Sequence, residues 1–235
     1  MTLFTDFLSF ERDFLKPLIA RRHISVIEKP LNQLENWHFD EQGRLSSTFF
    51  AIKGVHTEFA SEPEGQEQKP WDQPVYTQSP AQLALIIDEE KNLLMRAVFE
   101  PGNATRGYEG RGLILCTSCK ASQGNIAKLK AEGTIPPFFS LLDDERATHL
   151  ASCEAPADGA RIDKQNHHDL IQAPRTVIEE AHAALEPVTR ELYALVSLDL
   201  YLECYTKHAL VGEHLRDLSS MMLTVHVPPL SVRGG

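Results

Sequence analysis

The sequence predicts an α+β fold in which helices are laid on a β-sheet. Strand-like patterns occupy the middle of the chain, one helical pattern precedes them at residues 4–20, and several follow from Thr176 onward. Strands and helices are therefore segregated along the chain, which is typical of this class. No internal repeat, low-complexity tract or linker divides the 235 residues, so we predict one domain over residues 1–235.

The first element is a predicted amphipathic helix over residues 4–20. Its apolar residues recur at three- and four-residue spacing, and Thr2 or Thr5 is placed to cap it. We interpret it as a helix that packs on the core; a helix that docks a second copy is the alternative. A short strand is expected at 23–28, a strand at 47–59 with a bulge at Gly54, and a surface loop at 61–70.

Further strands are expected in the centre of the chain, at residues 71–78, 83–88, 93–99 and 111–118. The middle two are predicted to pair as a hairpin. The Glu100–Asn103 turn that follows them has Pro-Gly at its centre, which favours a type II turn with Gly102 at positive φ. A helix at 126–132 and a last short strand at 160–163 complete this region.

The C-terminal third is predicted to be helical. Helical spacing is present at residues 176–185, 188–207 and 210–227. Pro187 lies near the start of the second of these helices, and Pro228 ends the third.

Composition excludes several classes of protein. The net charge of -10 argues against general nucleic-acid binding, which usually requires a basic face. No apolar run approaches the roughly 20 residues that span a bilayer. The N-terminus has acidic residues where a signal peptide needs a basic flank and a long apolar run. We therefore expect a cytoplasmic protein without a membrane partner.

Cys116 and Cys119 form a C-x-x-C pair, and Cys153 and Cys204 stand alone. A zinc site would need a second pair of ligands at suitable spacing. Residues three apart in a regular strand point to opposite faces, so the pair cannot share a metal without a bend. We interpret the cysteines as inert thiols, with metal or redox use as the alternative.

One stretch, Leu93 to Asn125, is locally basic within this acidic chain. Between Arg96 and Lys130 there are six Lys or Arg residues and two Glu residues. A cationic, glycine-rich hairpin on an acidic body indicates a site for an anionic small molecule.

Several segments, taken in this order, resemble the NDP-hexose 2,3-dehydratase family. They are Trp37 with GRLSSTFFAIKGV, the Gln73-Pro74 strand continuing to LIIDEEKNLLMRAVFEPGN, CTSCKASQGN at residues 116–125, DGARIDKQNHHDLI at 158–171, and a tail beginning LYALVSLDLYLE. EPGN is the sharpest of these pieces alone, and the ordered set is far more specific than any member. Family members usually carry two tandem copies of this unit, and the chain is similar to one copy.

The resemblance implies a Nudix-like fold, a mixed sheet flanked by helices. The Nudix hydrolase signature R-E-x-x-E-E is absent, so we do not expect pyrophosphate hydrolysis. The chain also departs from the family pattern. Lys120 replaces a Gln, Thr117 and Ser118 replace Pro and Thr, Ser122 replaces Thr, His167 and His168 replace Arg-Asn, and Arg44 replaces a His.

The resemblance further implies removal of water from C2–C3 of a nucleotide-linked 4-keto-6-deoxyhexose without a cofactor or metal. Such a reaction needs a general base, donors for the developing enolate and an acid for the leaving hydroxyl. Our candidate catalytic residues are Glu100, Lys120, Lys164 and His167. Our candidate substrate-binding residues are Trp37, Asn103, Arg106, Arg111, Ser118, Ser122, Asn125, Asn166 and His168.

Each candidate also has a structural interpretation. Glu100 would act as a base if burial raised its pKa, or it would simply close the turn with Asn103. Ser118, Lys120 and Ser122 would share one polar face if their strand were regular. The histidines have a pKa suited to acid–base chemistry, but neighbours on a strand face opposite ways, so at most one enters a pocket. The two loop arginines would clamp phosphates or stay solvated.

Two functions from different classes remain open. The first is a lyase acting on a thymidine-diphosphate sugar or a related carbonyl intermediate of natural-product biosynthesis, working as a homodimer that supplies both family units. The second is a non-catalytic Nudix-like module that binds a nucleotide or pathway intermediate. The Gly234-Gly235 end is interpreted as an ordinary tail, with a carrier-protein role as the alternative.

Overall fold

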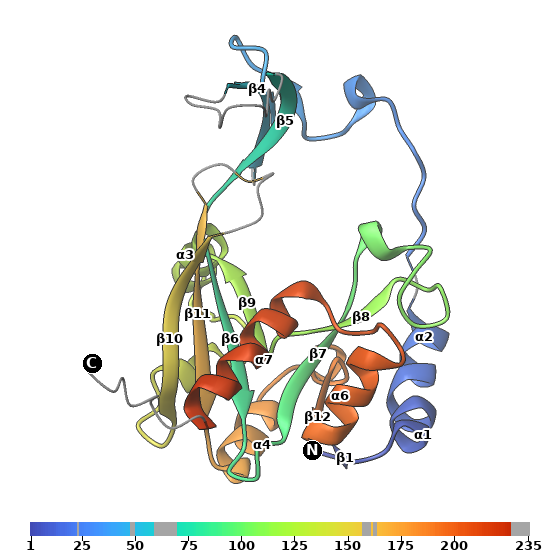
Figure 1. Ribbon diagram of the computed structural model, residues 1–235, viewed down its shortest axis with the longest axis vertical. Helices are drawn as coiled ribbons and strands as arrows, with labels where there is room; N and C mark the ends of the chain where they lie inside the picture. The colour runs from blue at the N-terminus through green and yellow to red at the C-terminus, as the bar shows by residue number, and fades with distance from the viewer. Residues whose placement is uncertain (23, 48–49, 59–69, 157–160, 162–163, 227–235) are drawn as a thin grey trace, which may run out of the picture.

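The predicted α+β class is confirmed. The computed structural model describes residues 1–22, 24–47, 50–58, 70–156, 161 and 164–226, and Figure 1 shows their arrangement. An eight-stranded mixed sheet forms the body, and a separate four-stranded antiparallel sheet extends from one end of it. Among the described residues, no helix has the length and apolar character needed to span a membrane.

The large sheet has six strands in one continuous path and two further strands that pair beside its centre. In order, the path is β1 (Leu3–Phe4), β12 (Tyr193–Val196), β7 (Leu93–Phe99), β6 (Ala81–Ile87), β11 (Gln165–Gln172) and β10 (Thr148–Pro156), while β8 (Leu113–Cys116) pairs with β7 and β9 (Cys119–Ser122) pairs with β6. The β1–β12 and β6–β11 pairs are parallel and the others antiparallel.

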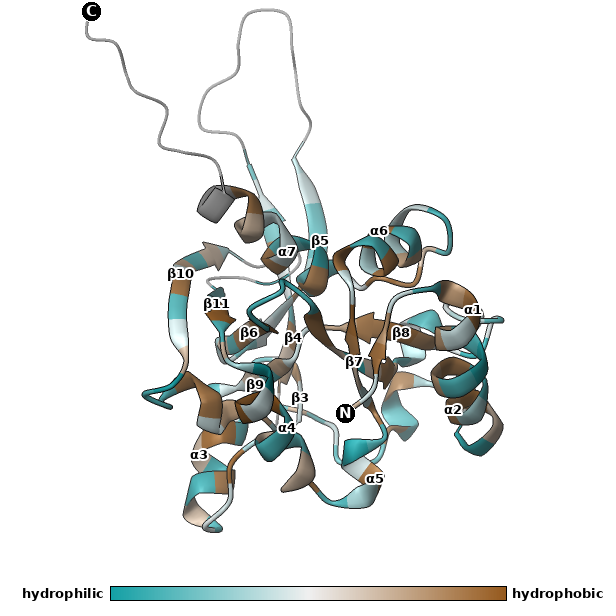
Figure 2. Ribbon diagram, turned by 90° about the horizontal axis from the view of Figure 1, so that it is seen from below, coloured by the Kyte–Doolittle hydropathy of each residue, from teal (hydrophilic) through white to brown (hydrophobic). Residues whose placement is uncertain are grey.

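Helices cover both faces of this sheet. On one face pack α1 (Phe7–Phe10), the π-helical turn η1 (Glu11–Leu15), α2 (Lys16–Arg21), α6 (Leu198–Thr206) and α7 (Glu213–His226). On the other face pack α4 (Arg175–Ala183), the 3₁₀ turn η4 (Phe139–Leu142) and one side of α3 (Gln123–Ala131); α5 (Pro187–Arg190) leads into β12. Because both faces are covered, β6, β7 and β8 are mostly apolar, with Gln82 and Arg96 as exceptions, and β7 and β8 are mainly brown in Figure 2.

The small sheet contains β2 (His38–Phe39), β3 (Leu45–Ser46), β4 (Phe50–Thr57) and β5 (Trp71–Gln78), after the 3₁₀ turn η2 (Leu31–Gln33). It projects beyond the large sheet, so that its long β4–β5 ribbon stands clear of the body (Figure 1). The two strands pair without interruption from Phe50–Gln78 to Thr57–Trp71. The bulge predicted at Gly54 is therefore wrong, because Gly54 pairs in register with Pro74.

The centre of the large sheet is split. Strands β6 and β7 pair only near their shared turn, through Ile86–Leu94 and Ile87–Leu93. Beyond that point they diverge, and β8 and β9 fill the gap between them, one on each side. The strand predicted at 111–118 is confirmed only over Leu113–Cys116, because residues 117 and 118 form a corner between β8 and β9.

Ser118 occupies the point of divergence. Its Oγ donates a hydrogen bond to the Leu94 carbonyl at 2.5 Å and accepts one from the Ile86 N–H at 2.9 Å. The residue is fully buried. One hydroxyl therefore satisfies a backbone donor and a backbone acceptor that the split would otherwise leave unpaired.

The sequence located most of the other elements correctly. A helix was predicted at residues 4–20, and helical structure covers residues 7–21. Its N-cap is Asp6 instead of Thr2 or Thr5, because the Asp6 side chain accepts a hydrogen bond from the Ser9 N–H. The strands at 71–78 and 93–99 are confirmed. The strand expected at 23–28 is not formed over residues 24–28. The loop predicted at 61–70 and the strand predicted at 160–163 lie largely outside the described residues.

Two further predictions are wrong. The helix predicted at 188–207 is interrupted by β12, four buried residues inserted between β1 and β7. The turn after β7 is a 3₁₀ turn, η3 (Pro101–Asn103), and Gly102 does not adopt a positive φ. The positive φ values occur further along the loop, at Gly107, Glu109, Gly110 and Gly112. A Cβ on Gly107 would lie 2.4 Å from the Leu113 carbonyl oxygen, so this position requires glycine.

We predict that Ser118→Ala lowers the free energy of unfolding by about 1–3 kcal/mol, because it leaves a buried N–H and a buried C=O unpaired. Urea denaturation measures the change. The control is Ser152→Ala on the exposed surface of β10, which we expect to change stability by less than about 0.5 kcal/mol. Equal stability of the two variants would contradict the bridging role of Ser118.

Candidate active site

A cavity of about 450 Å³ lies where the small sheet joins the large one. Its walls come from the bases of β4 and β5, the N-terminal end of β6, strand β9, the start of α3, the segment leading into β11, and the N-terminus of α7. The lining residues are Phe50, Gln78, Ala81, Glu100, Lys120, Ala121, Ser122, Asn125, Arg161, Lys164, Asn166 and His214.

The cavity is cationic although the chain is acidic. Lys120, Arg161 and Lys164 line it, and Glu100 is the one carboxylate among the described lining residues. Lys120 pairs across the strands with Leu83, so its side chain leaves β9 on the face that α7 covers. The excess of positive charge suits an anionic ligand.

Glu100 and Lys120 form a loose ion pair, with 3.9 Å between Oε1 and Nζ. The other carboxylate oxygen of Glu100 accepts a hydrogen bond from the Asn103 side-chain amide at 3.3 Å. The Glu100 side chain remains 41% exposed. The condition set for Glu100 to act as a base, burial of its carboxylate, is therefore not met, and its hydrogen bond with Asn103 supports the alternative that it closes the turn.

Lys164 is the enclosed cation of the site. The residue is 8% exposed, and its Nζ donates a hydrogen bond to the Gln78 side-chain carbonyl at 2.8 Å. Burial lowers the pKa of this amine, and the nearby charges of Arg161 and Lys120 lower it further. The neutral amine, which is the form able to accept a proton, is thus more accessible than in a solvated lysine.

His214 is the second residue of α7 and forms the wall next to that helix. Burial lowers its pKa to about 4, with smaller contributions from Lys120, His168, Arg161 and Lys164. The imidazole is therefore neutral at pH 7. Its Nδ1 is buried without a hydrogen-bond partner among the described residues.

Asn166 and His168 project from β11 to the same side of the sheet as the cavity. Asn166 lines the cavity, and its Oδ1 accepts a hydrogen bond from the Ala81 N–H at 3.1 Å, which fixes the first residue of β6. His168 lies behind the wall, with its ring 6.5 Å from that of His214. Burial lowers the pKa of His168.

Ser122 and Asn125 border the cavity at the start of α3. The Ser122 hydroxyl accepts the Asn125 N–H at 3.2 Å and caps the helix. The predicted polar face of three side chains is thus reduced to Lys120 and Ser122, because Ser118 is buried at the corner between β8 and β9.

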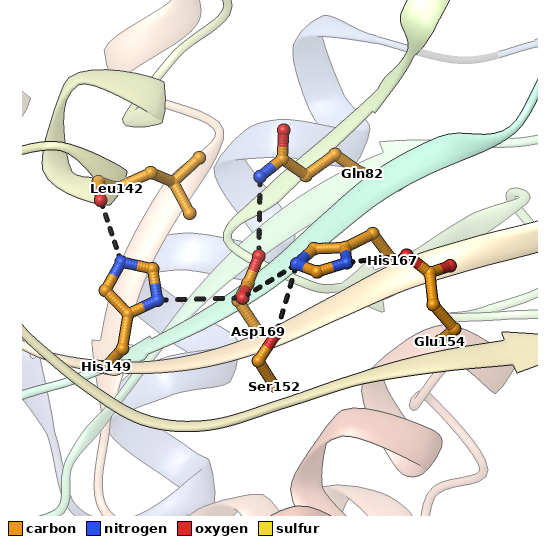
Figure 3. A network of polar contacts seen from close by, with 7 residues as sticks. All are labelled: Gln82, Leu142, His149, Ser152, Glu154, His167 and Asp169. Carbon is orange, nitrogen blue, oxygen red and sulfur yellow. Dashed lines mark hydrogen bonds and ion pairs between the residues drawn. The ribbon is translucent and has the colours of Figure 1, made fainter.

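His167 lies on the opposite face of the sheet from the cavity. Figure 3 shows it among side chains of β10 and β11, close to the buried carboxylate of Asp169. Its Nδ1 is 2.9 Å from a Glu154 oxygen, and its Nε2 is 3.1 Å from Ser152 Oγ and 3.2 Å from Asp169 Oδ1. The carboxylates of Glu154 and Asp169 raise the pKa of His167, with the Glu154 hydrogen bond as the largest cause.

The same network includes His149 and Gln82, which also contact Asp169 (Figure 3). Among the described residues, no group of three or more His, Cys, Asp or Glu side chains has the geometry to hold a metal ion. The structure thus does not bring His167 together with Glu100, Lys120 and Lys164. Alternation along β11 places His168, not His167, on the cavity side.

The remaining candidates do not line the cavity. Trp37 packs edge-on against Phe50, with 5.0 Å between ring centroids, and so supports the wall from behind. Arg106 and Arg111 are exposed on the glycine-rich loop, and Asn103 contacts the cavity through Glu100 alone. Their binding roles stay predictions.

Six lining residues were not predicted as site residues from the sequence: the two small residues Ala81 and Ala121, and four with larger side chains. Phe50 and Arg161 lie within segments that resembled the family, so the ordered motifs carried a signal for them. Gln78 ends β5 and differs from other surface glutamines only by its contact with Lys164. His214 lies in an apparently ordinary amphipathic helix, and nothing in the sequence distinguishes it.

The C-x-x-C cysteines occupy the two sides of the strand corner. Both are buried and carry free thiols. Burial raises the pKa of Cys116 to about 11 and raises that of Cys119 further. Their thiols are protonated at pH 7, which supports the interpretation that they are inert.

Comparison with known proteins adds three findings. The family model for NDP-hexose 2,3-dehydratase matches residues 11–210. The solved structure titled "Crystal structure of ADP compounds hydrolase" is similar at 14% identity and a TM-score of 0.38, over 76% of this chain and 86% of that chain. A TM-score at that level supports no argument about fold or substrate. A search of curated proteins found no match.

The two histidines with opposite pKa shifts give a pH prediction. His214 binds its proton more weakly in the folded chain, so its contribution to stability falls as the pH decreases from about 6.5 towards 4. His167 has a raised pKa, so its contribution is present at low pH and is lost as the pH rises through that pKa. We expect His214→Gln to reduce the loss of stability between pH 7 and pH 5, and His167→Gln to increase it.

Thermal denaturation of both variants and the unmodified protein at the two pH values measures these differences. Comparing each protein with itself removes any general destabilisation by the substitution. A loss between pH 7 and pH 5 that is the same in all three proteins would contradict both assignments.

Proposed function

Because the chain belongs to the NDP-hexose 2,3-dehydratase family, with residues 11–210 matching its model, we propose that it removes water from C2–C3 of a nucleotide-linked 4-keto-6-deoxyhexose. We place this reaction in the cavity between the two sheets. The chemistry needs a general base and hydrogen-bond donors but no redox step. The alternative, a binding module without catalysis, is an outcome of the experiment below.

One observation carries the proposal. Three segments that resemble the family, and that are distant in sequence, contribute side chains to a single cavity. EPGN supplies Glu100, CTSCKASQGN supplies Lys120, Ser122 and Asn125, and DGARIDKQNHHDLI supplies Arg161, Lys164 and Asn166. Motifs brought together in this way are expected of a functional site, whereas structural motifs would be spread through the core.

The size and charge of the cavity support a nucleotide sugar. A volume of about 450 Å³ lies within the range of small-molecule sites, roughly 300–1,000 Å³. Lys120 and Arg161 supply positive charge for a diphosphate, and the amides of Asn125 and Gln78 can hydrogen-bond sugar hydroxyls. The homodimer and the cytoplasmic location predicted above remain predictions that the size of the native particle and the location of a tagged protein would test.

The experiment combines binding with turnover. We expect thymidine diphosphate to raise the melting temperature, because a ligand at a hundredfold excess over Kd stabilises the folded state by about 2.7 kcal/mol. We also expect the protein to release water from at least one of a panel of 4-keto nucleotide sugars, detected by mass spectrometry. Binding without turnover on the whole panel would favour the binding module. The absence of both binding and turnover would contradict the proposal.

Substituting one lysine inside the cavity and one outside it tests whether the nucleotide binds in the cavity. Lys120→Ala should weaken nucleotide binding about fivefold or more, because it removes a charge from a partly enclosed cavity. Lys128→Ala on α3 removes an exposed lysine that pairs only loosely with Glu132, at 4.0 Å, and should leave binding unchanged. Equal effects of the two substitutions would place the nucleotide elsewhere.

A further inference from the structure

Two titratable groups in the cavity are buried or half-buried, and their surroundings favour the neutral form of each. They are the amine of Lys164, from the segment leading into β11, and the imidazole of His214, from the start of α7. They reach the same cavity from elements about fifty residues apart. Neither group has a carboxylate as a hydrogen-bond or ion-pair partner among the described residues, whereas Lys120 forms an ion pair with Glu100 and His167 contacts Glu154.

Lys164 is better placed than Glu100 to act as a base. Glu100 is solvated and engaged by Lys120 and Asn103. Lys164 is nearly buried, and its one described partner is the neutral oxygen of Gln78, which orients the amine without supplying a charge that would hold it protonated. Arg161 and Lys120 repel a proton on the amine.

His214 is suited to donate a hydrogen bond while remaining neutral. The groups that face it are Lys120 from β9, Arg161, Lys164 and His168, and each disfavours a second proton on the ring. The N-terminal end of α7 adds positive potential. Nδ1 is buried without a hydrogen-bond partner among the described residues, so a proton on it would have no acceptor, and we assign the ring proton to Nε2.

We propose that Lys164 removes the C3 proton of the substrate, and that His214 donates a hydrogen bond from Nε2 to the C4 carbonyl oxygen. This inference rests on the proposed function and names the groups that perform it. A neutral imidazole that polarises a carbonyl, combined with a separate base, is a known solution for proton abstraction beside a ketone.

The step balances without a co-reactant. The C3–H bond breaks, its proton goes to Lys164 Nζ, and its electron pair forms a C3=C4 double bond while the carbonyl π pair moves to the oxygen that His214 holds. The carbonyl then re-forms, the C3=C4 pair shifts to C2=C3, and the C2–O bond breaks. The departing hydroxyl takes the proton from the Lys164 ammonium and leaves as water, which returns the amine to its neutral form.

Exchange of the C3 proton with deuterium oxide tests the two roles separately from the elimination. We expect Lys164→Gln to lower both exchange at C3 and release of water by about 10²–10⁴-fold. His214→Ala should lower kcat about 10²-fold or more with little change in KM, and His214→Gln, which keeps a donor, should recover part of the loss. In the unmodified protein, kcat should rise with pH as the Lys164 amine loses its proton.

Controls separate the roles from folding and from binding. Each variant should retain a cooperative thermal transition and a melting-temperature rise with thymidine diphosphate, and His167→Gln and Lys128→Ala should retain full turnover. This inference would be overturned, with the proposed function left intact, if the Lys164→Gln variant kept a turnover rate within tenfold of the unmodified protein. The same holds if His214→Ala changed only KM and not kcat. An unmodified protein that binds the nucleotide but turns over none of the substrates would overturn the proposed function, and this inference with it.

Discussion

The split between β6 and β7 is the constraint on which the site depends. Two antiparallel strands that start as a hairpin must part for β8 and β9 to enter between them, and parting strands leave backbone groups without partners. The Ser118 hydroxyl bonds both at the point of separation, to Leu94 and Ile86. Once β9 runs beside β6, its outward side chains stand over the N-terminal end of β6, and Lys120 and Ser122 reach the cavity.

The chemistry of this cavity arises from a local excess of positive charge in a chain whose net charge is negative. The protein carries a net charge of -10, yet three cations lie around one carboxylate at the junction of its sheets. Their mutual repulsion is reduced by the negative charge of Glu100 and by the solvation of Lys120, whose side chain is partly exposed. The same repulsion favours neutral forms for the enclosed Lys164 and His214. The net charge of the whole chain therefore did not indicate the sign of the charge in this cavity.

Much of the fold could be predicted from the sequence because the period of its apolar residues matched the final structure. The strands at 71–78 and 93–99 are flanked by clear turns, and the first helix has a regular apolar stripe. Strand β12 could not be predicted in the same way. Its residues, YALV, continue the apolar spacing of the neighbouring helical segments, and only the space between β1 and β7 makes them extended.

Some residues of the candidate site could likewise be predicted from the sequence, and others could not. The family-like segments located Glu100, Lys120, Lys164 and Asn166, since a local motif carries each of them. His167 was a reasonable candidate by residue type, but side chains alternate along β11, so its side chain lies on the face opposite to that of Asn166, which lines the cavity. Ser118 belongs to a motif and yet serves the backbone. His214 enters the site only because α7 begins beside the cavity, and no short-range pattern contains that information.

The junction of the two sheets also determines which changes of length the protein can absorb. Gln78 ends β5 and Ala81 begins β6, so only Ser79 and Pro80 separate two cavity walls. An added residue there would lengthen a two-residue connection, and we expect it to shift Gln78 relative to Ala81 and to weaken its contact with Lys164. The far end of the β4–β5 ribbon, seven residue pairs from Phe50–Gln78 and about 23 Å away at the usual rise of a strand, has no such restriction. We therefore expect insertions at that end of the ribbon to disturb the cavity less than insertions between Gln78 and Ala81.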